Sequence, residues 1–412
     1  MARIAATGKK SITLPQEKVE GLPETFPGRR VEASFGPISV PWHLWCGVGA
    51  VFSGAFGLYW DVSWHMSIGR DSFWTPAHVA MQMCGVVAGL TCGYLILSHT
   101  FGRRPAPEAR DASVRIWGFH GPLGAFICTW GSLAMLTGAP FDNWWHAAYG
   151  LDVKLKSPPH SLLIGGTFII GFGVLVMVCA AMNRASGELK QKLTWLSLLV
   201  GGLMIAIILL ISLEYKFRPV MHSALFYRTV SVVVPIVLIT VSLPTGRRWA
   251  CSIVIAIYTG LLLADVWIFP LFPAEPKLGP VFHKIDHFVP YEFPLLLIAP
   301  AVVLDLLSIK IRGWDKRLQA AVFGSAFFLT FLLVQWPFAT FLMSPGARNR
   351  VFGAGYMGYS THPDSYYARH LFFQLEQTGA HFWIRMLEAL TGAILSSGLG
   401  LIGADLMRRI RR

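Results

Sequence analysis

The chain has 412 residues, of which 54% are hydrophobic and only 14% are charged. This composition, with its positive mean hydropathy, excludes an ordinary soluble globular domain and indicates a protein with many membrane spans. The net charge of +13 does not indicate nucleic-acid binding, because the basic residues are scattered in short segments between apolar runs.

Ten apolar segments are long enough to cross a bilayer, so the predicted fold is an all-α, polytopic bundle of about ten transmembrane helices. The segments lie near residues 42–60, 76–98, 115–137, 159–182, 193–213, 225–243, 250–270, 291–309, 319–343 and 382–406. Residues 1–40 are polar and rich in Pro and Gly, which is typical of a flexible cytoplasmic tail. After this tail we expect a metal-binding four-helix module at 41–185 and a six-helix module of unassigned role at 186–412.

Basic residues follow every even-numbered segment, and the positive-inside rule therefore places both termini in the cytoplasm. These residues are Arg103, Arg104, Arg110, Arg184, Lys190, Lys192, Arg247, Arg248, Lys310, Arg312, Lys316, Arg317, Arg408, Arg409, Arg411 and Arg412. In a bacterial inner membrane the opposite connections would face the periplasm. Most of the histidines lie on or beside those outer connections, so we expect the chemistry at the outer face.

A motif of acidic and imidazole side chains follows the first predicted span. Its first copy reads Asp61-Val-Ser-Trp-His65, followed after a short loop by Thr75-Pro76-Ala-His78. Asp61 and His65 are four residues apart and share one face if the segment is helical. Thr75 is a good N-cap with Pro76 at the first helical position, which places His78 in the first turn, facing back toward the loop.

The same motif occurs a second time. Asp142-Asn-Trp-Trp-His146 is followed by Ser157-Pro158-Pro159-His160. Two imidazoles and one carboxylate make a site for a first-row metal, and open coordination positions suit redox or hydrolytic chemistry. The alternative is a set of interfacial polar residues, with the tryptophans marking the membrane boundary. Six ligand-type residues matched in two copies favour the metal sites.

The later outer connections hold further polar residues without this pattern. His222, His283, His287 and Glu292 are candidates for an additional site, although hydrogen-bonded ordering of a loop is the simpler interpretation. Asp265 lies in an apolar segment and is a functional candidate for that reason. The six cysteines form no Cys-x-x-Cys pair and indicate small buried side chains rather than disulfides.

The first motif resembles the metal-binding segment of the C subunit of the copper membrane monooxygenases, the particulate methane and ammonia monooxygenase group. In that family an Asp, a His four residues on and a His thirteen further bind copper within the membrane, with an Arg-Asp pair and a Thr-Pro between. All of those positions match here, with the pairs at Arg70-Asp71 and Thr75-Pro76. The resemblance covers roughly residues 45–180 and leaves the last six predicted spans unmatched.

The resemblance implies a copper site formed by Asp61, His65 and His78. The residues expected to position the loop around this site are Arg70, Asp71 and Thr75.

The resemblance also implies a neighbouring site. It would be framed by Asp142, His146 and His78, with His160 nearby and without a firm role. Asp142 stands where the family has an Asn, which adds negative charge to the site and favours a more highly charged metal.

Two functions are compatible with these features. The first is a copper-dependent membrane oxidoreductase, the metal-bearing subunit of a monooxygenase, which activates dioxygen to oxidise a small or lipophilic substrate. Iron and zinc are the alternative metals, and the expected partners are the bilayer, other monooxygenase-type subunits or a second copy, and an unidentified electron donor. The second function is non-catalytic: metal binding or delivery, or a structural role in a larger membrane complex. A proton-relay transporter is less favoured, because the ligands cluster at one face rather than at mid-span.

Overall fold

The computed structural model describes residues 39–102, 112–150, 157–212, 220–282, 284–356 and 379–412. The predicted tail at 1–40 lies outside these ranges except for its last two residues. Ile38–Arg412 forms one compact unit, and the predicted module boundary near residue 185 falls inside it, between two helices.

The described part of the chain is mostly helical. Its long helices are α1 (Trp42–Ser67), α2 (Pro76–Phe101), α4 (Leu123–Tyr149), α5 (Pro158–Arg184), α6 (Gly187–Ile211), α7 (Ala224–Ser242), α8 (Ala250–Ile268), α9 (Ile298–Lys310), α10 (Lys316–Leu342) and α13 (Ala380–Arg409). The short 3-10 turns are η3 (Leu243–Thr245), η4 (Phe269–Leu271) and η5 (Pro345–Ala347). Among the described residues, eight helices are long and apolar enough to cross a membrane, and α1 and α9 are not among the eight. The chain therefore has the predicted character of a polytopic helical membrane protein, whereas ten spans and cytoplasmic termini stay predictions.

The helix in the region of the third predicted span, 115–137, begins later than predicted. Val114–Ile116 (β1) and Phe119–Gly121 (β2) pair as an antiparallel hairpin instead of forming the first turns of a helix. Trp117 and Gly118 connect them with φ angles of 50° and 86°, values that a tight hairpin turn requires and a right-handed helix excludes. The helix α4 therefore begins only after the hairpin.

The eighth predicted span, 291–309, is helical only over α9, which has 13 residues. Buried side chains accept hydrogen bonds from the backbone of the non-helical segment before α9: Tyr291 N donates to Asp265, Leu295 N to Tyr258 and Leu296 N to Gln335. Non-helical backbone inside a membrane needs such partners, because no water is available to replace them. Asp265 therefore has a structural role in this segment, whereas the sequence had suggested a functional role for it.

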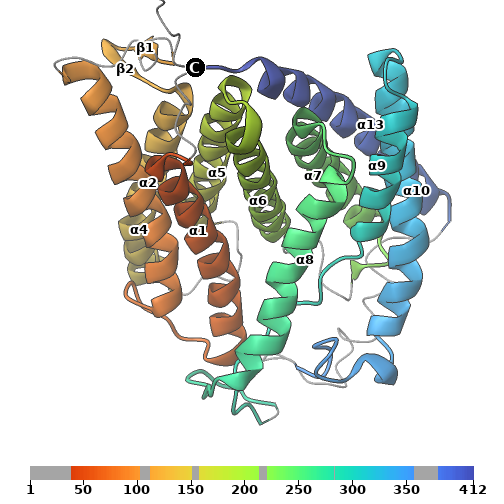
Figure 1. Ribbon diagram of the computed structural model, residues 1–412. Coiled ribbons are helices and arrows are strands. Elements are labelled where there is room, and N and C mark those ends of the chain that lie inside the picture. The colour runs from red at the N-terminus through yellow and green to blue at the C-terminus, as the bar shows by residue number, and fades with distance from the viewer. Residues whose placement is uncertain (1–38, 103–111, 151–156, 213–219, 283, 357–378) are drawn as a thin grey trace, which may run out of the picture. The chain divides into compact units, whose positions relative to one another are not determined.

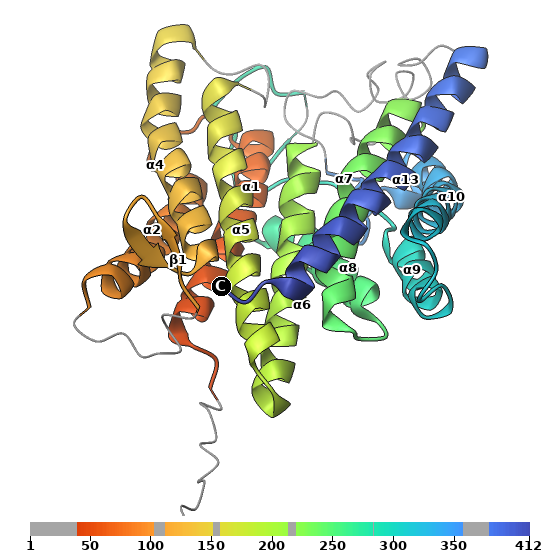
Figure 2. The same ribbon diagram turned by 90° about the horizontal axis from the view of Figure 1, so that it is seen from above.

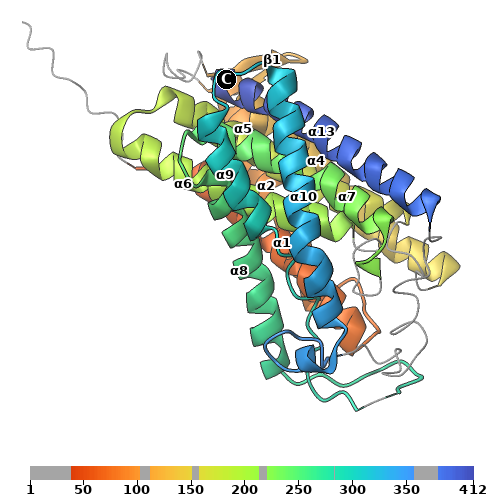
Figure 3. The same cartoon turned by 90° about the vertical axis from the view of Figure 1, so that its right-hand side faces the viewer.

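Helix α6 joins two groups of helices (Figures 1 and 2). On one side α1 packs against α2, α2 against α4, and α4 against α5. On the other side α13 packs against α7 and α10, and α9 contacts α8 and α10, an arrangement that Figure 3 shows from the side. Because α6 contacts α1 and α5 as well as α7 and α8, both groups belong to the same compact unit.

Glycines let the helices that carry the repeated motif approach closely. A Cβ added to Gly166 of α5 would lie 2.8 Å from the carbonyl oxygen of Gly131 on α4, and one added to Gly131 would lie 2.9 Å from the carbonyl of Gly166. A Cβ on Gly57 of α1 would lie 2.7 Å from the amide nitrogen of Met81 on α2. Small residues at helix contacts are what close packing in a bilayer uses. These contacts hold α1 beside α2 and α4 beside α5.

The end of α1 is also attached to the second half of the chain. The Ser63 hydroxyl donates to the Val289 carbonyl, and the Val289 N–H donates to the Ser67 hydroxyl. The Lys277 N–H donates to the Ile68 carbonyl. The connection between α8 and α9 therefore holds the last turns of α1 and the loop that follows.

The connections at the two ends of the helices differ in chemistry. The connection between α1 and α2 lies at the lower end in Figure 1, whereas the α5–α6 connection and the C-terminus lie at the upper end. The upper end carries Arg184, Lys190 and Arg408, and the lower end carries His65 and the residues that follow it. The first copy of the motif therefore lies at the end of the helices opposite these basic residues, and the side of the membrane that each end faces stays a prediction.

Replacing Gly166 by Leu is expected to destabilise the protein by about 1–3 kcal/mol or more, because the new side chain meets the backbone of α4. The matched control is Gly165→Leu on the same helix, where an added Cβ has no neighbour within 4 Å and loss of a glycine favours the helix. Thermal unfolding in mild detergent measures the difference. Equal unfolding temperatures for the two variants would show that α4 and α5 are not in backbone contact.

Two candidate metal centres

The first copy of the motif forms one compact cluster of side chains. Asp61 and His65 come from the last two turns of α1, Asp71 from the loop, and His78 from the first turn of α2. One ligand atom from each of these four residues lies within 4.8 Å of every other. The three residues predicted to bind metal are therefore together, and the structure adds Asp71 to them.

The distances in this cluster place each imidazole against both carboxylates. His78 Nε2 is 3.1 Å from Asp61 Oδ1 and 3.2 Å from Asp71 Oδ2. His65 Nε2 is 3.4 Å from Asp71 Oδ2 and 3.8 Å from Asp61 Oδ2. The side chains of Asp71 and His78 are 9% and 15% exposed, but that of His65 is 45% exposed. The cluster is therefore enclosed on the Asp71 side and open to the surroundings at His65.

A backbone carbonyl orients His78. Its Nδ1 lies 2.8 Å from the Ser72 carbonyl oxygen, which can only accept a hydrogen bond, so Nδ1 carries a proton. In a neutral imidazole the lone pair is then on Nε2, the atom that faces the two carboxylates. A metal ion at this point would take the place of the proton that Nε2 otherwise donates to the carboxylates, and orientation of this kind by the second ring nitrogen is typical of metal-binding histidines.

Local hydrogen bonds shape the loop around the cluster. Trp64 Nε1 donates to the carbonyl of Arg70, while the Arg70 side chain is exposed. Thr75 occupies the predicted N-cap position of α2, but its hydroxyl accepts from the Ser72 N–H and not from a helix N–H. Of the three residues expected to position the loop, Arg70 and Thr75 therefore support it, Arg70 through its backbone.

Asp71 has a more direct position than the sequence analysis assigned to it. We expected it to position the loop, but its carboxylate lies against both imidazoles of the cluster. Burial opposes ionisation of Asp71, but hydrogen bonds from His65 and His78 and their positive charges outweigh burial and hold the pKa of its carboxyl well below its usual range. Asp71 is therefore ionised at neutral pH, the form in which a carboxylate binds a cation.

The second copy of the motif forms a second cluster, between the end of α4 and the start of α5. Asp142 Oδ1 is 3.2 Å from His160 Nε2, and Asp142 Oδ2 is 3.6 Å from His146 Nε2. The Ser157 hydroxyl accepts from the His160 N–H, which is the predicted capping arrangement. Asp142 is buried, and the two histidine side chains are 22% and 24% exposed.

His146 is oriented in the same way as His78. Its Nδ1 lies 3.1 Å from the Gly150 carbonyl, which leaves Nε2 to face Asp142. Gly150 closes α4 with a φ of 85°, a backbone conformation that a residue with a Cβ adopts only with strain. In each copy, therefore, a main-chain carbonyl just outside the motif fixes one imidazole.

The two clusters share no residue in the described part of the chain. The resemblance implied that His78 would join Asp142 and His146, but His78 belongs to the first cluster and His160 takes that place in the second. The reason is the helix pairing: α1 packs against α2 and α4 against α5, so each acidic helix end meets the histidine of the next helix.

The donor atoms of both clusters fit a metal ion of the first transition row. Metal–ligand bonds of about 2.0–2.2 Å place neighbouring donor atoms roughly 3 to 3.5 Å apart, close to the separations seen here. Asp61 Oδ1 is buried and accepts no well-directed hydrogen bond from the described residues, although His78 Nε2 is nearby. This oxygen is therefore placed where a bound cation, or a proton on His78, would stabilise it.

The residues proposed for an additional site do not come together in the described part of the chain. His222 is buried, and its Nε2 lies 3.0 Å from the Thr340 hydroxyl. His287 Nδ1 lies 2.7 Å from Asp286, and Glu292 is buried. His283 lies outside the described residues. His222 therefore contacts α10, and His287 contacts its neighbour in the same connection.

No family model matches the chain, and the searches of curated proteins and of solved structures find no match either. The geometry of the two clusters therefore carries the functional argument, and the resemblance to the copper monooxygenase subunit stays a hypothesis.

The grouping of the histidines can be tested by metal content. Wild-type protein loaded with copper is expected to hold two ions per chain, and His78→Ala and His160→Ala are each expected to hold one. His99→Ala, on α2 but outside both clusters, is the control and should hold two. Elemental analysis of protein purified in mild detergent gives the ratios. If His78→Ala lost both ions, His78 would serve both sites and the separation into two clusters would be wrong.

Asp71→Asn is expected to weaken binding of the first ion by about tenfold or more, the loss typical even for groups that only support metal ligands. The asparagine is nearly the same size but removes one negative charge from the cluster. Arg70→Gln is the control, because the Arg70 side chain is exposed and only its backbone carbonyl is used. Metal titration by calorimetry measures the affinity of each variant. Similar affinities for Asp71→Asn and Arg70→Gln would show that Asp71 positions the loop and does not bind the ion.

Proposed function

We propose that this protein is an integral-membrane metalloprotein that binds one first-row metal ion in each cluster and uses copper to activate dioxygen for oxidation of a small or lipophilic substrate. The observation that carries the proposal is the pair of His and carboxylate clusters in which a backbone carbonyl turns one imidazole Nε2 toward the acidic oxygens. The protein would act as the metal-bearing subunit of a membrane monooxygenase.

The ligand sets leave room for chemistry at the metal. Asp142, His146 and His160 supply three protein ligands, so positions remain for water, dioxygen or substrate. The first cluster supplies four ligands, but His65 is half-exposed and marks the side on which an external ligand can approach. A bound first-row metal supplies dioxygen activation, and the residues of this chain hold it, set its charge and control access.

The aromatic residues beside the clusters support a lipophilic substrate. Trp74 lies in the loop after Asp71, and Trp144 and Tyr149 lie in the last turns of α4; their side chains are largely exposed. Exposed Trp and Tyr of this kind mark the boundary between lipid and water. A molecule dissolved in the bilayer could therefore reach the clusters from the membrane side.

The metal is proposed as copper on the basis of the sequence resemblance. Two histidines and one carboxylate, the set in the second cluster, are also the ligands that non-haem iron oxygenases use, and zinc accepts the same donors. The reaction would insert one oxygen atom of dioxygen into a C–H bond and release the other as water, with two electrons and two protons from an external reductant. The partner that delivers these electrons, and other subunits or a second copy, belong to the same proposal.

The proposal is tested by electron paramagnetic resonance and oxygen uptake. Copper-loaded wild-type protein is expected to give a cupric signal with nitrogen coupling, and His65→Ala combined with His146→Ala is expected to lose most of it. Membranes containing the wild-type protein and a reductant should take up oxygen in a substrate-dependent manner, whereas membranes with the double variant should not. His99→Ala again serves as the control.

The alternative function, metal delivery without catalysis, makes a different prediction in the same experiment. It requires transfer of the ion to an acceptor protein or chelator without oxygen uptake. An iron signal in place of copper would keep both clusters but change the metal. Absence of any bound metal in the loaded wild-type protein would contradict the proposal and leave two hydrogen-bonded charge clusters with a structural role.

A further inference from the structure

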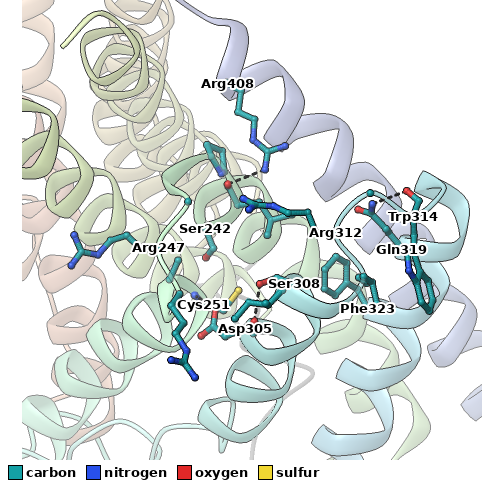
Figure 4. Close-up of a pocket in the computed structure, with 18 of the residues that line it drawn as sticks. Ser242, Arg247, Cys251, Asp305, Ser308, Arg312, Trp314, Gln319, Phe323 and Arg408 are labelled. Atoms are coloured by element: carbon teal, nitrogen blue, oxygen red, sulfur yellow. Dashed lines mark hydrogen bonds between the residues drawn. The ribbon is translucent and has the colours of Figure 1, made fainter. Parts of the chain in front are cut away.

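The basic end of the protein contains a pocket that the metal clusters do not use. It has a volume of about 680 Å³ and lies among the turn between α7 and α8, the turn between α9 and α10, and the last turns of α13 (Figure 4). The C-terminus lies at this end, opposite the α1–α2 connection that carries the first cluster. The pocket is therefore separate from the proposed metal chemistry.

Five basic residues line this pocket. They are Arg247, Arg248, Arg312, Lys316 and Arg408. Figure 4 shows the side chains of Arg312 and Arg408 at the same side of the pocket, with Arg408 bonded to the Leu243 carbonyl. Like charges gathered at one pocket repel each other, and an anion bound among them reduces that repulsion. The arrangement is thus suited to an anionic ligand.

The acidic residues nearby cannot neutralise this charge. Asp305 also lines the pocket, but its carboxylate accepts from the N–H groups of Cys251 and Ser252 and so caps the start of α8. Asp405 is shared between Lys316 and Arg408. Within the described residues, Arg312 forms no ion pair. Five basic residues line the pocket and two engaged carboxylates lie near it, although Figure 4 shows Arg247 directed away from Arg312 and Arg408.

Tryptophans place the pocket at the depth of lipid headgroups. Trp314 lines the pocket and is 50% exposed, and Trp249 and Trp195 are exposed at the same end of the helices. Arg247 lies over the ring of Trp195 at 4.3 Å, and Arg248 lies 5.3 Å from the ring of Trp249. Exposed Trp beside Arg is the pattern of a membrane–water interface. An anion at this depth is most readily supplied by the membrane itself.

We propose that this pocket binds the phosphate group of an anionic phospholipid headgroup. Arg312 and Arg408 would contact the phosphate oxygens, because the planar guanidinium fork matches the geometry of phosphate. Arg408 is already held in place by its bonds to the Leu243 carbonyl and to Asp405. The apolar side chains of Ile309 and Phe323 line the same pocket and would contact the glycerol and upper acyl chains.

The lipid would join three segments that are far apart in the sequence. The α7–α8 turn, the α9–α10 turn and α13 each contribute a basic side chain to the pocket. Basic pockets between membrane helices on the positively charged side recognise anionic headgroups in this way. Occupancy should therefore stabilise the second half of the chain and leave metal content unchanged.

The test uses full-length, delipidated protein in mild detergent. Phosphatidylglycerol, phosphatidylcholine and inorganic phosphate are added separately, and thermal unfolding and native mass spectrometry are recorded. The test variant is Arg248→Gln with Arg312→Gln. The matched control is Arg115→Gln with Arg409→Gln, which removes the same charge from exposed positions that do not line the pocket.

Phosphatidylglycerol is expected to bind wild-type protein and the control equally, and to bind the test variant about tenfold more weakly, the loss expected from one charge-assisted contact. If the test variant unfolds without lipid, Arg312→Lys replaces it and should bind with intermediate affinity, because it keeps the charge but loses the planar fork. Equal binding by wild type and variant would overturn the proposal, as would equal binding of phosphatidylcholine. Protection by inorganic phosphate at the same level would also overturn it, in favour of a site for a soluble anion.

Discussion

Close contact between helix backbones is the constraint on which both candidate metal clusters depend. Asp142 and His146 meet His160 only because α4 and α5 touch through Gly131 and Gly166, where neither helix has a side chain to hold them apart. In a bilayer the hydrophobic effect gives apolar side chains little reason to leave the lipid. Van der Waals contact between small residues therefore stabilises the association of membrane helices. The ligand geometry is therefore a product of helix packing as much as of the ligands themselves.

The sequence was a good guide wherever chemistry followed helical periodicity. Asp61 and His65 lie on one helix face, and Ser157 caps the helix that presents His160, as expected from spacing and capping rules. The membrane helices themselves were evident from apolar length. What the sequence could not provide was the contribution of the main chain. The carbonyls of Ser72 and Gly150 orient two imidazoles. Because every residue has a carbonyl, the sequence does not indicate which of them will do so.

The errors in the sequence analysis also have physical causes. The hairpin before α4 has apolar residues at Val114, Ile116 and Phe119, which suggested a membrane helix, although Arg115, His120 and the turn at Trp117-Gly118 interrupt them. The segment before α9 is apolar enough to span, but Asp265, Tyr258 and Gln335, from other helices, hold it in a non-helical conformation. Such tertiary hydrogen bonds are invisible to a reading of local propensity. The placement of His78 with Asp71 rather than Asp142 likewise depended on which helices become neighbours.

The attachment of the α8–α9 connection to the end of α1 has a consequence for the exchange of metal. Val289 and Lys277 fasten Ser63, Ser67 and Ile68 from outside the first motif, so the loop bearing Asp71 is anchored at its start whether or not an ion is bound. Anchoring at this point would reduce the conformational entropy lost when an ion binds, and it opposes local unfolding of the end of α1. Slow release would suit the resident metal of the proposed function, whereas a metal carrier needs a site that opens readily.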